Sequence, residues 1–299
     1  MLESNISDII PTSIAENIAG NYDIYLKSTL PHILFYKKFL EKNPLQQPLL
    51  SSKKPKILLP ENKKILILDL DETLIHAEFL ESSNVNINTK DEKDNMIIEN
   101  NEKYDTVLSF YSEIPSNNSN DNDNESNSDN TTDDESKDDS CEKELTKVGI
   151  FLRPKLKEFL EEISKFFYIG IFTASVPEYA DAIINYLDPE EKYIKFRLYR
   201  NDCAIINNAL RTKDLKIFGE NINLKNIVLI DNNIYSFIPQ MNNGILINSF
   251  FGNKLDDELT NVSRYLIDYI LPCDDVREVN DTFFGFNKIM EKLRINRRL

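Results

Sequence analysis

The chain has 299 residues, enough for one large domain or two small ones, and 41% of them are hydrophobic. This hydrophobic share is low for a globular chain and indicates a substantial part that does not pack into a core. The formal net charge of -15 argues against nucleic acid as a direct ligand. The three cysteines lie far apart without paired metal spacing, so we expect reduced thiols and neither a disulfide framework nor a zinc site.

The first 60 residues carry the weakest pattern. Residues 24–40 predict a helix that Pro31 could kink, and residues 44–60 predict an extended connector. We therefore expect residues 1–60 to form a partly ordered N-terminal extension and residues 61–299 to form the main domain. No stretch predicts a membrane-spanning helix, and the first residues lack the basic region of a signal peptide. We expect a soluble protein of the nucleus or cytoplasm.

The stretch KKILILDLDETL at residues 63–74 places two acids directly after an apolar run. The run predicts a buried strand, and Asp69, Asp71 and Thr73 follow it. An uncompensated carboxylate at the edge of an apolar core is costly unless a cation pairs with it. The alternative is an ordinary strand-end turn whose acids are solvated.

Most of the charge is concentrated in one acidic tract. Residues 113–144 hold 12 acids and 2 lysines, so -10 of the net charge of -15 lies there. This composition predicts a disordered segment. Alternating residues at 104–112 and an apolar run at 145–154 predict strands on either side, so the tract is expected to be a long hairpin loop inserted into a folded domain. It could be a solvated loop, a kinase substrate or an autoinhibitory segment.

The remainder of the chain alternates between short apolar runs and amphipathic segments. The runs VGIFL, YIGIF, NIVLI and GILINSF predict strands, and helices are expected after Pro154, from Pro177 and over residues 256–271. Buried strands that alternate with helices are typical of a parallel sheet covered on both faces. The sequence therefore predicts an α/β fold with a Rossmann-like, doubly wound parallel sheet and a small β-hairpin insertion.

Polar side chains with related chemistry follow these strands, where ligands of doubly wound sheets bind. Asp69, Asp231 and Asn232 offer the hard oxygen ligands that Mg2+ prefers. Thr173 and Lys213 could hold a phosphoryl group, an aspartate can serve as a nucleophile, and Asp71 could protonate the leaving oxygen and then activate water. Lys213 could instead be a surface lysine, and Thr173 could cap the following helix.

The motifs DLDETL, FTAS, the lysine of TKDL and the DN pair of IDNN, in this order, resemble the haloacid dehalogenase superfamily of aspartate-nucleophile phosphatases. Within it, the chain is similar to the small phosphatases that act on the C-terminal domain of RNA polymerase II, the NLI-interacting-factor-like family. The resemblance spans roughly residues 63–293 without the acidic tract. It includes LRP at 152–154, EYAD at 178–181, RLYRNDC at 197–203 and DDVREVN at 274–280.

This resemblance implies a Mg2+-dependent phosphoserine/phosphothreonine protein phosphatase with an aspartyl-phosphate intermediate and a haloacid dehalogenase-like fold. It implies that the polymerase C-terminal domain is a possible phosphoprotein partner. The implied roles are nucleophile and metal ligand for Asp69, general acid/base and metal ligand through its carbonyl for Asp71, phosphoryl contacts for Thr173 and Lys213, metal ligand for Asn232, and support from Thr73 and Asp231.

The resemblance also implies an apolar substrate pocket formed with the hairpin after DLDETL. The matching positions are Phe79, Val176, Tyr179 and Arg200, with Val107 as a further candidate, although the apolar ones could be ordinary core residues. The hairpin is short in the family, whereas here it carries the acidic tract. Substrate preference is therefore the property that the resemblance transfers least.

Two other functions remain open at this stage. A mitochondrial import-translocase subunit uses the same fold as a non-catalytic interaction module, but the intact Asp69 and Asp71 favour an enzyme. A small-molecule phosphatase of the same superfamily is disfavoured because the sequence predicts no cap domain to enclose a metabolite. The sequence does not predict an oligomeric state.

Overall fold

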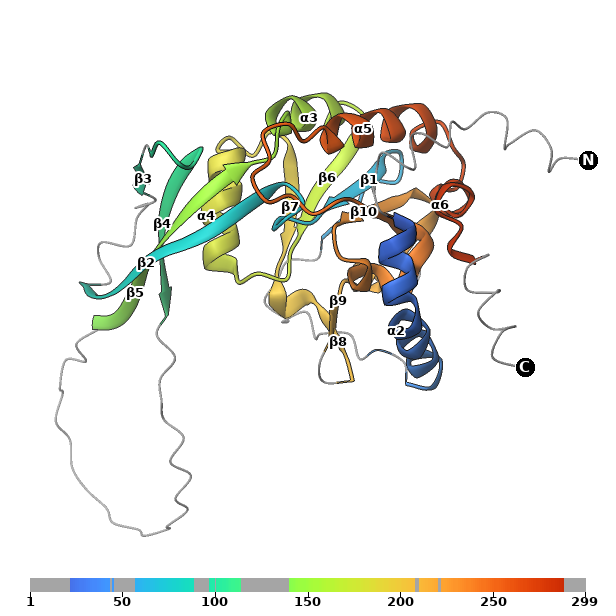
Figure 1. Cartoon of the computed structure of the whole chain (residues 1–299), viewed down its shortest axis with the longest axis horizontal. Helices are drawn as coiled ribbons and strands as arrows, with labels where there is room; N and C mark the ends of the chain where they lie inside the picture. The colour runs from blue at the N-terminus through green and yellow to red at the C-terminus, as the bar shows by residue number, and fades with distance from the viewer. Residues whose placement is uncertain are drawn as a thin grey trace, which may run out of the picture. The chain divides into compact units, whose positions relative to one another are not determined.

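The computed structural model describes residues 22–43, 45, 57–88, 97–99, 101–113, 140–207, 210–219 and 222–287 (Figure 1). The chain divides into two compact units. Unit 1 comprises Met1–Ala77 and Phe151–Leu299, and unit 2 comprises Glu78–Ile150.

A five-stranded parallel sheet forms the centre of unit 1, with the strand order β11-β10-β1-β6-β7. Strand β1 (Lys64–Leu68) pairs with β10 (Ile227–Asp231) on one side and with β6 (Phe167–Phe172) on the other. The outer strands are β7 (Ile194–Leu198) and β11 (Gly244–Leu246). This order confirms the predicted α/β fold with a parallel sheet.

Both faces of this sheet are covered. Every residue of β10 is buried, and so is every residue of β1 after Lys64. Successive side chains of a strand point to opposite faces, so a strand without any exposed position must be packed on both sides. The unbroken apolar runs in the sequence reflect this double coverage.

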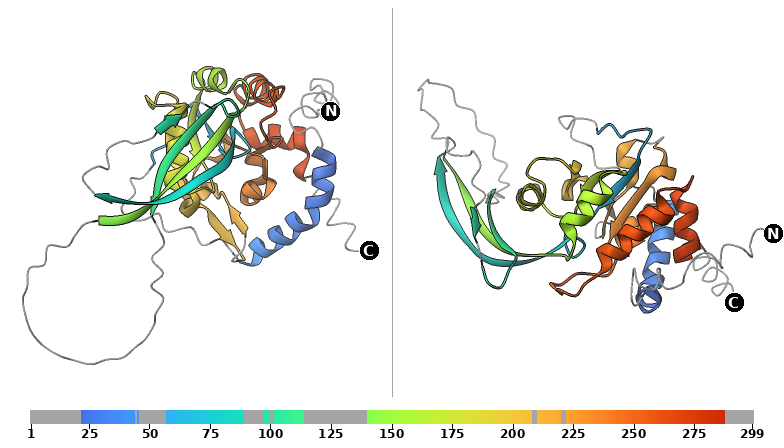
Figure 2. Two further views of the ribbon diagram at one scale, coloured as in Figure 1. Left: turned by 60° about the vertical axis from the view of Figure 1, so that its left-hand side comes forward. Right: turned by 90° about the horizontal axis from the view of Figure 1, so that it is seen from above.

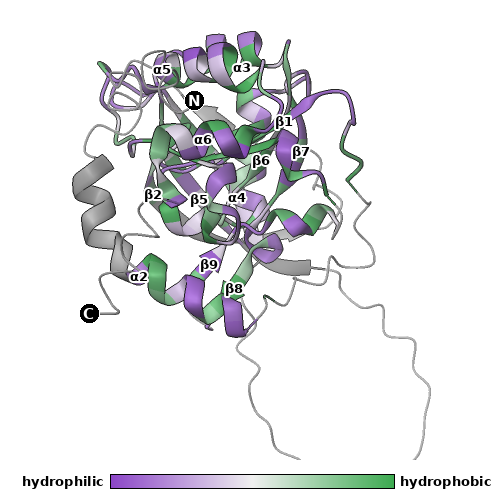
Figure 3. Ribbon diagram, turned by 90° about the vertical axis from the view of Figure 1, so that its right-hand side faces the viewer, coloured by the Kyte–Doolittle hydropathy of each residue, from purple (hydrophilic) through white to green (hydrophobic). Residues whose placement is uncertain are grey.

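Three helices of unit 1 follow the predicted amphipathic segments, whereas the last one, α6 (Val276–Phe284), was not expected. The three are α3 (Leu156–Ile163), α4 (Pro177–Leu187) and α5 (Glu258–Tyr265), which continues as the π-helix η6 (Leu266–Ile270). Helix α3 contacts α5 (Figure 2). Its apolar residues, which have the spacing of an amphipathic helix, are all buried: Leu156, Phe159, Leu160 and Ile163. Figure 3 colours the ribbon by hydropathy and shows hydrophobic and hydrophilic residues alternating along α3, as in an amphipathic helix. Pro177 opens α4, where its missing N–H costs no hydrogen bond.

Short irregular elements complete unit 1. In the part of the chain that the structure describes, the 3-10 segments are η2 (Arg200–Asp202), η3 (Leu215–Phe218), η4 (Leu224–Asn226) and η5 (Ile234–Asn243). A two-stranded antiparallel pair is formed by β8 (Ala204–Ile206) and β9 (Leu210–Thr212). The pair β8–β9 leads directly into Lys213, one of the predicted site residues.

Part of the predicted N-terminal extension packs on the rest of unit 1. Helix α2 (Tyr22–Lys42) is continuous through Pro31, and its residues Ile33 and Leu34 are buried. His32 Nδ1 lies 3.2 Å from the hydroxyl of Tyr235 in η5, and α2 contacts η5. Residues 1–21, 44 and 46–56 of the predicted extension lie outside the described residues. Within the described part of the chain, no helix has both the length and the apolar character needed to cross a membrane.

Unit 2 contains an antiparallel sheet that the sequence predicts in part. Its order is β2 (Ile75–Asn88), β5 (Ser140–Leu152), β4 (Thr106–Glu113) and β3 (Ile97–Glu99), with the ends of β2 and β5 in unit 1. Strands β4 and β5 pair from Thr106↔Ile150 to Glu113↔Lys143, which confirms the predicted hairpin. Strands β2 and β3 were not expected. Tyr104 packs so closely on Gly149 that a Cβ there would lie 2.6 Å from its ring.

The bounds of the predicted acidic loop need correction at both ends. Glu113 belongs to β4 and residues 140–144 belong to β5, although the sequence predicts disorder over residues 113–144. Strand pairing uses backbone hydrogen bonds and does not require apolar side chains, so the hairpin continues into polar sequence. Residues 114–139 lie outside the described residues, and the predicted disorder of the loop stays a prediction there.

Glu258, at the start of α5, is a buried acid without a cation of its own. Its side-chain Oε1 accepts a hydrogen bond from the amide of Asn248, whereas the buried Oε2 has no hydrogen-bond partner in the described structure. Burial raises the pKa of the Glu258 carboxyl to about 8, against the lowering effect of the Asn248 hydrogen bond and of the Arg153 charge. The folded protein therefore holds a proton there at neutral pH.

We predict that Glu258→Gln flattens the pH dependence of stability. Above the ordinary pKa of 4.5, the unfolded chain releases this proton while the folded chain keeps it, so stability falls as pH rises from about 4.5 to about 8. Glutamine stays neutral, and the stability difference between variant and parent should change by about 3 kcal/mol between pH 5 and pH 8. Urea unfolding at several pH values measures this, with the exposed Glu178→Gln as the matched control. Parallel profiles for parent and Glu258→Gln would contradict the assignment.

Candidate active site

The central strands bring the predicted acids to one edge of the sheet. Asp69 directly follows β1, and its backbone N–H donates to the carbonyl of Ile230 at 2.9 Å. Asp231 is the last residue of β10, and Thr173 follows β6. Parallel neighbours end at the same edge, so these side chains meet outside the carboxyl ends of the strands. Strand β1 is the switch point of the sheet, because the chain continues to β6 on one side and later returns to β10 on the other.

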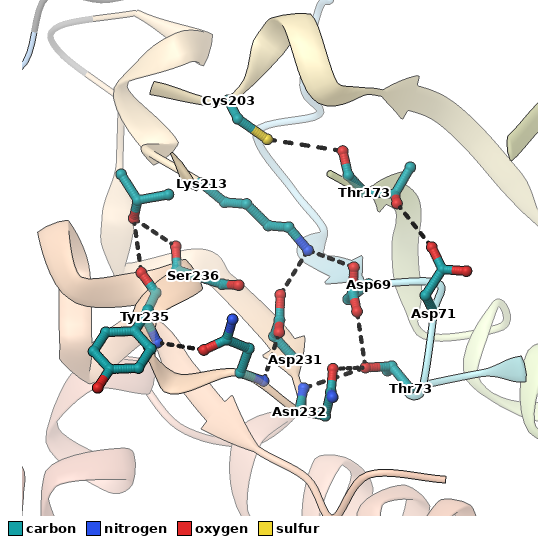
Figure 4. Close-up of polar contacts among 12 residues, drawn as sticks. Asp69, Asp71, Thr73, Thr173, Cys203, Lys213, Asp231, Asn232, Tyr235 and Ser236 are labelled. Carbon is teal, nitrogen blue, oxygen red and sulfur yellow. Dashed lines mark hydrogen bonds and ion pairs between the residues drawn. The ribbon is translucent and has the colours of Figure 1, made fainter. Parts of the chain in front are cut away.

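Lys213 joins the acids of β1 and β10 (Figure 4). Its Nζ lies 2.5 Å from Asp69 Oδ1 and 2.6 Å from Asp231 Oδ2. The backbone beneath it is fixed, since the N–H of Lys213 donates to the carbonyl of Ser236 at 2.7 Å. The preceding Thr212 hydroxyl donates to the same carbonyl at 2.9 Å. The ammonium group is therefore held between two carboxylates by the main chain as well as by charge.

This arrangement contradicts two alternatives that the sequence left open, a solvated strand-end turn for Asp69 and a surface position for Lys213. Asp69 is 6% exposed and Lys213 is 3% exposed. A solvated strand-end turn would leave the aspartate open to water, and a surface lysine would extend into it. The cation that the structure places beside Asp69 is Lys213, and the metal ion that the sequence predicts there stays a prediction.

Thr73 connects the nucleophile candidate to Asn232. Its hydroxyl lies 3.1 Å from Asp69 Oδ2 and 3.2 Å from Asn232 Oδ1, and it accepts the backbone N–H of Asn232 at 3.2 Å. The amide nitrogen of Asn232 donates to the Ser249 hydroxyl at 3.0 Å, which orients the amide oxygen toward Thr73. The predicted supporting position of Thr73 is thus a hydrogen-bonded bridge between two predicted metal ligands.

Asp71 is held by donors from the segment after β6. Ser175 Oγ donates to Asp71 Oδ2 at 2.8 Å, and the hydroxyl of Tyr179 donates to Asp71 Oδ1. Thr173 Oγ1 lies 3.5 Å from the same Oδ2. The sequence places Ser175 in the FTAS motif at the strand end without assigning it a role, and the structure supplies that role as a donor to Asp71.

The alternative that Thr173 caps the following helix is wrong. Helix α4 has Val176 at its N-cap position and no side-chain hydrogen bond there. The Thr173 hydroxyl instead accepts the backbone N–H of Ser175 at 3.0 Å. This local turn leaves the hydroxyl at the strand edge, on the side of Asp71.

The excess of buried acid sets the electrostatics of the site. Burial raises the pKa of Asp71, and the neighbouring Asp69 raises it further, which favours a protonated carboxyl. Burial and the charge of Asp69 also raise the pKa of Asp231 to about 6. For Lys213, burial alone would lower the pKa, but Asp231 and Asp69 more than offset it and raise the pKa above its ordinary range. One lysine thus faces three carboxyl groups.

These residues fit a divalent cation of the hard class. In the described residues, no group of three or more His, Cys, Asp or Glu side chains is placed to hold a metal. The predicted donor set differs, because it combines the Asp69 carboxylate with the Asn232 amide oxygen and the Asp71 carbonyl. Mg2+ is usually bound by one or two carboxylates and keeps several waters. The hydroxyl of Thr73 touches oxygens of both Asp69 and Asn232, so both donors lie on one side of the site.

Three of the predicted pocket residues, Val176, Tyr179 and Arg200, belong to unit 1. Tyr179 is buried and bonded to Asp71, and Val176 is half-buried at the start of the same helix. Arg200 is exposed, and its Nε donates to the carbonyl of Ala174 at 2.8 Å. Phe79, which is exposed, and Val107, which is buried, belong to unit 2. Their contribution to a pocket stays a prediction.

The comparisons with known proteins agree with this site. Residues 64–277 match the model of the NLI interacting factor-like phosphatase family. The chain belongs to this family. The match covers most of the chain and includes every candidate site residue, from Asp69 to Asn232, so the predicted family is confirmed.

Individual relatives match over shorter regions. CTD small phosphatase-like protein 2 of Dictyostelium discoideum is 40% identical over 132 residues, which cover 44% of this chain and 22% of that protein. CTD small phosphatase-like protein 3 of Caenorhabditis elegans is 37% identical over 133 residues, 44% of this chain and 45% of that protein. The matched region therefore spans less than half the length of either relative.

A solved structure is also similar, at a low level. It is that of a variant of the fission yeast RNA polymerase II CTD phosphatase Fcp1 bound to beryllium fluoride. It has a TM-score of 0.40 and 20% sequence identity to this chain, and the match covers 70% of this chain and 50% of that one.

We predict that Lys213→Met destabilises the fold by about 3–5 kcal/mol, because it leaves Asp69 and Asp231 buried without their cation. Adding Asp231→Asn should recover part of the loss by removing one of the two unpaired charges. Urea unfolding with a metal chelator present measures both effects. The exposed Lys157→Met on α3 is the matched control, and a Lys213→Met variant as stable as this control would contradict the structural role of the pair.

Proposed function

We propose that the chain is a Mg2+-dependent protein phosphatase that removes phosphate from phosphoserine or phosphothreonine through an aspartyl-phosphate intermediate. One observation carries the proposal, namely the Lys213 bridge between Asp69 and Asp231 beside a third carboxyl group, Asp71. A buried acid cluster with too few cations is costly for stability alone. It suits a site that receives a metal ion and a phosphate ester.

In the first step, a side-chain oxygen of Asp69 attacks the phosphorus atom of the substrate. The new bond between this oxygen and phosphorus forms while the bond from phosphorus to the seryl or threonyl oxygen breaks. Asp71 donates its proton to the leaving oxygen. Its raised pKa supports this role, and Ser175 and Tyr179 hold the carboxyl group in place.

In the second step, Asp71 acts in its ionised form as a base. It accepts a proton from a water molecule, whose oxygen attacks the phosphorus of the aspartyl-phosphate. Inorganic phosphate leaves, Asp69 regains its free carboxylate, and Asp71 regains its proton. Each group thus returns to its starting state, and the only net reactant besides the ester is water.

The remaining residues hold the charged groups in place. Thr173 and Lys213 would contact phosphoryl oxygens, and Lys213 lies 2.5 Å from the nucleophile candidate already. Asp69, Asn232 and the carbonyl of Asp71 would hold Mg2+. The ion would neutralise charge on the acids and on the transferred phosphoryl group. Asp231 keeps Lys213 oriented.

The substrate class is inferred from relatives. Two matched relatives are named as CTD small phosphatase-like proteins, and the motifs of the chain are similar to those of phosphatases that act on the polymerase tail. We therefore propose the phosphorylated C-terminal domain of RNA polymerase II as the first substrate to test. Cellular location in the nucleus or cytoplasm stays a prediction, as does the absence of direct nucleic-acid binding.

We predict that Asp69→Asn lowers phosphate release by at least about 1,000-fold, because the amide removes the nucleophile. Phosphate release would be measured with Mg2+ on polymerase-repeat peptides phosphorylated at single serines, on unrelated phosphopeptides and on p-nitrophenyl phosphate. The exposed Asp257→Asn would serve as the matched control. Equal activity of Asp69→Asn and parent would contradict the mechanism, and an inactive parent on every substrate would favour a non-catalytic interaction module.

We also predict that Asp71→Asn slows the second step and lets the phosphoenzyme accumulate, because no base remains to activate water. Rapid quenching with p-nitrophenyl phosphate should then show protein carrying the mass of one phosphoryl group, located on the peptide that contains Asp69. This substrate has a good leaving group, so the first step can proceed without the acid. Labelling of any other residue would rule out Asp69 as the nucleophile.

A further inference from the structure

Arg153 directly follows strand β5, and its side chain is fully buried. Its guanidinium group makes a bidentate pair with Asp256, with Nε and Nη2 each 2.8 Å from a carboxylate oxygen. Nη1 donates to the carbonyl of Thr73 at 2.9 Å, and Nη2 donates to the carbonyl of Asn248 at 2.8 Å. One side chain therefore binds three segments of the chain.

Two of these segments carry side chains of the site. The carbonyl of Thr73 belongs to the residue whose hydroxyl lies 3.1 Å from Asp69. The carbonyl of Asn248 precedes Ser249, whose hydroxyl accepts from the Asn232 amide at 3.0 Å. Arg153 thus supports the nucleophile candidate through one neighbour and the metal-ligand candidate through the other.

Further contacts keep the same two segments in place. The backbone N–H of Arg153 donates to the carbonyl of Leu74 at 3.0 Å, next to Thr73. The N–H of Phe250 donates to the carbonyl of Glu72 at 2.8 Å, which joins the two segments directly. The side chain of Asn248 donates to Glu258. The support therefore acts on the backbone of both segments.

The chemistry requires arginine at this position. A planar guanidinium can make a forked pair with a carboxylate and still direct donors to two carbonyl groups, whereas an ammonium is a compact point charge that cannot span them. Burying this charge is costly unless it is paired and hydrogen-bonded. Here Asp256 supplies the counter-charge and the two carbonyls supply the further acceptors.

We propose that Arg153 is a positioning residue that sets the placement of Asp69 relative to Asn232 and thereby the affinity of the site for a divalent cation. The inference rests on the proposed function, because it takes these two residues as metal ligands. It adds a role that the ligand residues alone do not reveal. Residues that orient metal ligands from behind commonly affect affinity or activity about 10-fold to 100-fold when changed.

The test is metal binding by the Arg153→Lys variant of the full chain. Mn2+ would serve as the probe, with its binding followed by electron paramagnetic resonance and Mg2+ affinity obtained by competition. We expect the dissociation constants to rise about 10-fold, because lysine keeps the positive charge but loses the fork. Turnover of p-nitrophenyl phosphate at saturating Mg2+ should fall as well.

Arg277→Lys is the matched control, since Arg277 also makes a two-point pair with an aspartate, Asp275, at the start of α6. Its metal affinity should equal that of the parent. A folded Arg153→Lys variant that binds Mn2+ within twofold of the parent would overturn the proposal. If Arg153→Lys does not fold, Asp256→Asn decides in its place, because it weakens the fork while leaving Arg153 intact.

Metal binding separates the two proposals. A parent that lacks phosphatase activity but binds Mn2+, with weaker binding in Arg153→Lys, would refute the proposed function and support the positioning role. An active parent whose Asp69→Asn variant is inactive, with unchanged Mn2+ binding in Arg153→Lys, would do the reverse.

Discussion

The ion-pair bridge of Lys213 between Asp69 and Asp231 is the interaction on which the rest of the site depends. It joins the ends of two central strands to a segment that follows a small antiparallel pair, and all three side chains are buried. Two carboxylates compete for one ammonium, and a third carboxyl group, that of Asp71, lies beside them. The parallel sheet brings these carboxyl groups together, because its strands end at the same edge and the side chains that follow them lie close to one another.

Asp69 and Asp71 differ in their hydrogen-bond partners. Asp69 faces the ammonium of Lys213 and the hydroxyl of Thr73, whereas Asp71 faces the hydroxyls of Ser175 and Tyr179. Burial and the charge of Asp69 raise the pKa of Asp71. Asp69 and Asp71, which have one residue between them, therefore lie in different environments. That of Asp69 suits a nucleophile, and that of Asp71 suits a group that transfers a proton.

The sequence predicts the parts of this site that depend on local pattern. An apolar run that closes on an acid marks the ends of β1 and β10, and the parallel sheet then places Asp69 near Asp231. The contacts of Tyr179 and Arg153 depend on packing between segments about a hundred residues apart, which no local pattern encodes. Arg153 stands in the LRP motif, so the sequence marked the position without its role. Strand β2 was missed because the polar run at residues 81–84 interrupts its alternation, and β3 was missed because three residues are too few to form a pattern.

The division into two units has a consequence for the chemistry. Every residue assigned to the nucleophile, the proton transfer, the phosphoryl contacts and the metal belongs to unit 1, although unit 2 is inserted directly after Ala77. The backbone hydrogen bond from Arg153 to Leu74 joins the chain on either side of the insertion. The reactive groups are thus held together within unit 1, whatever sequence the insertion carries. The proposed chemistry therefore requires no side chain of unit 2.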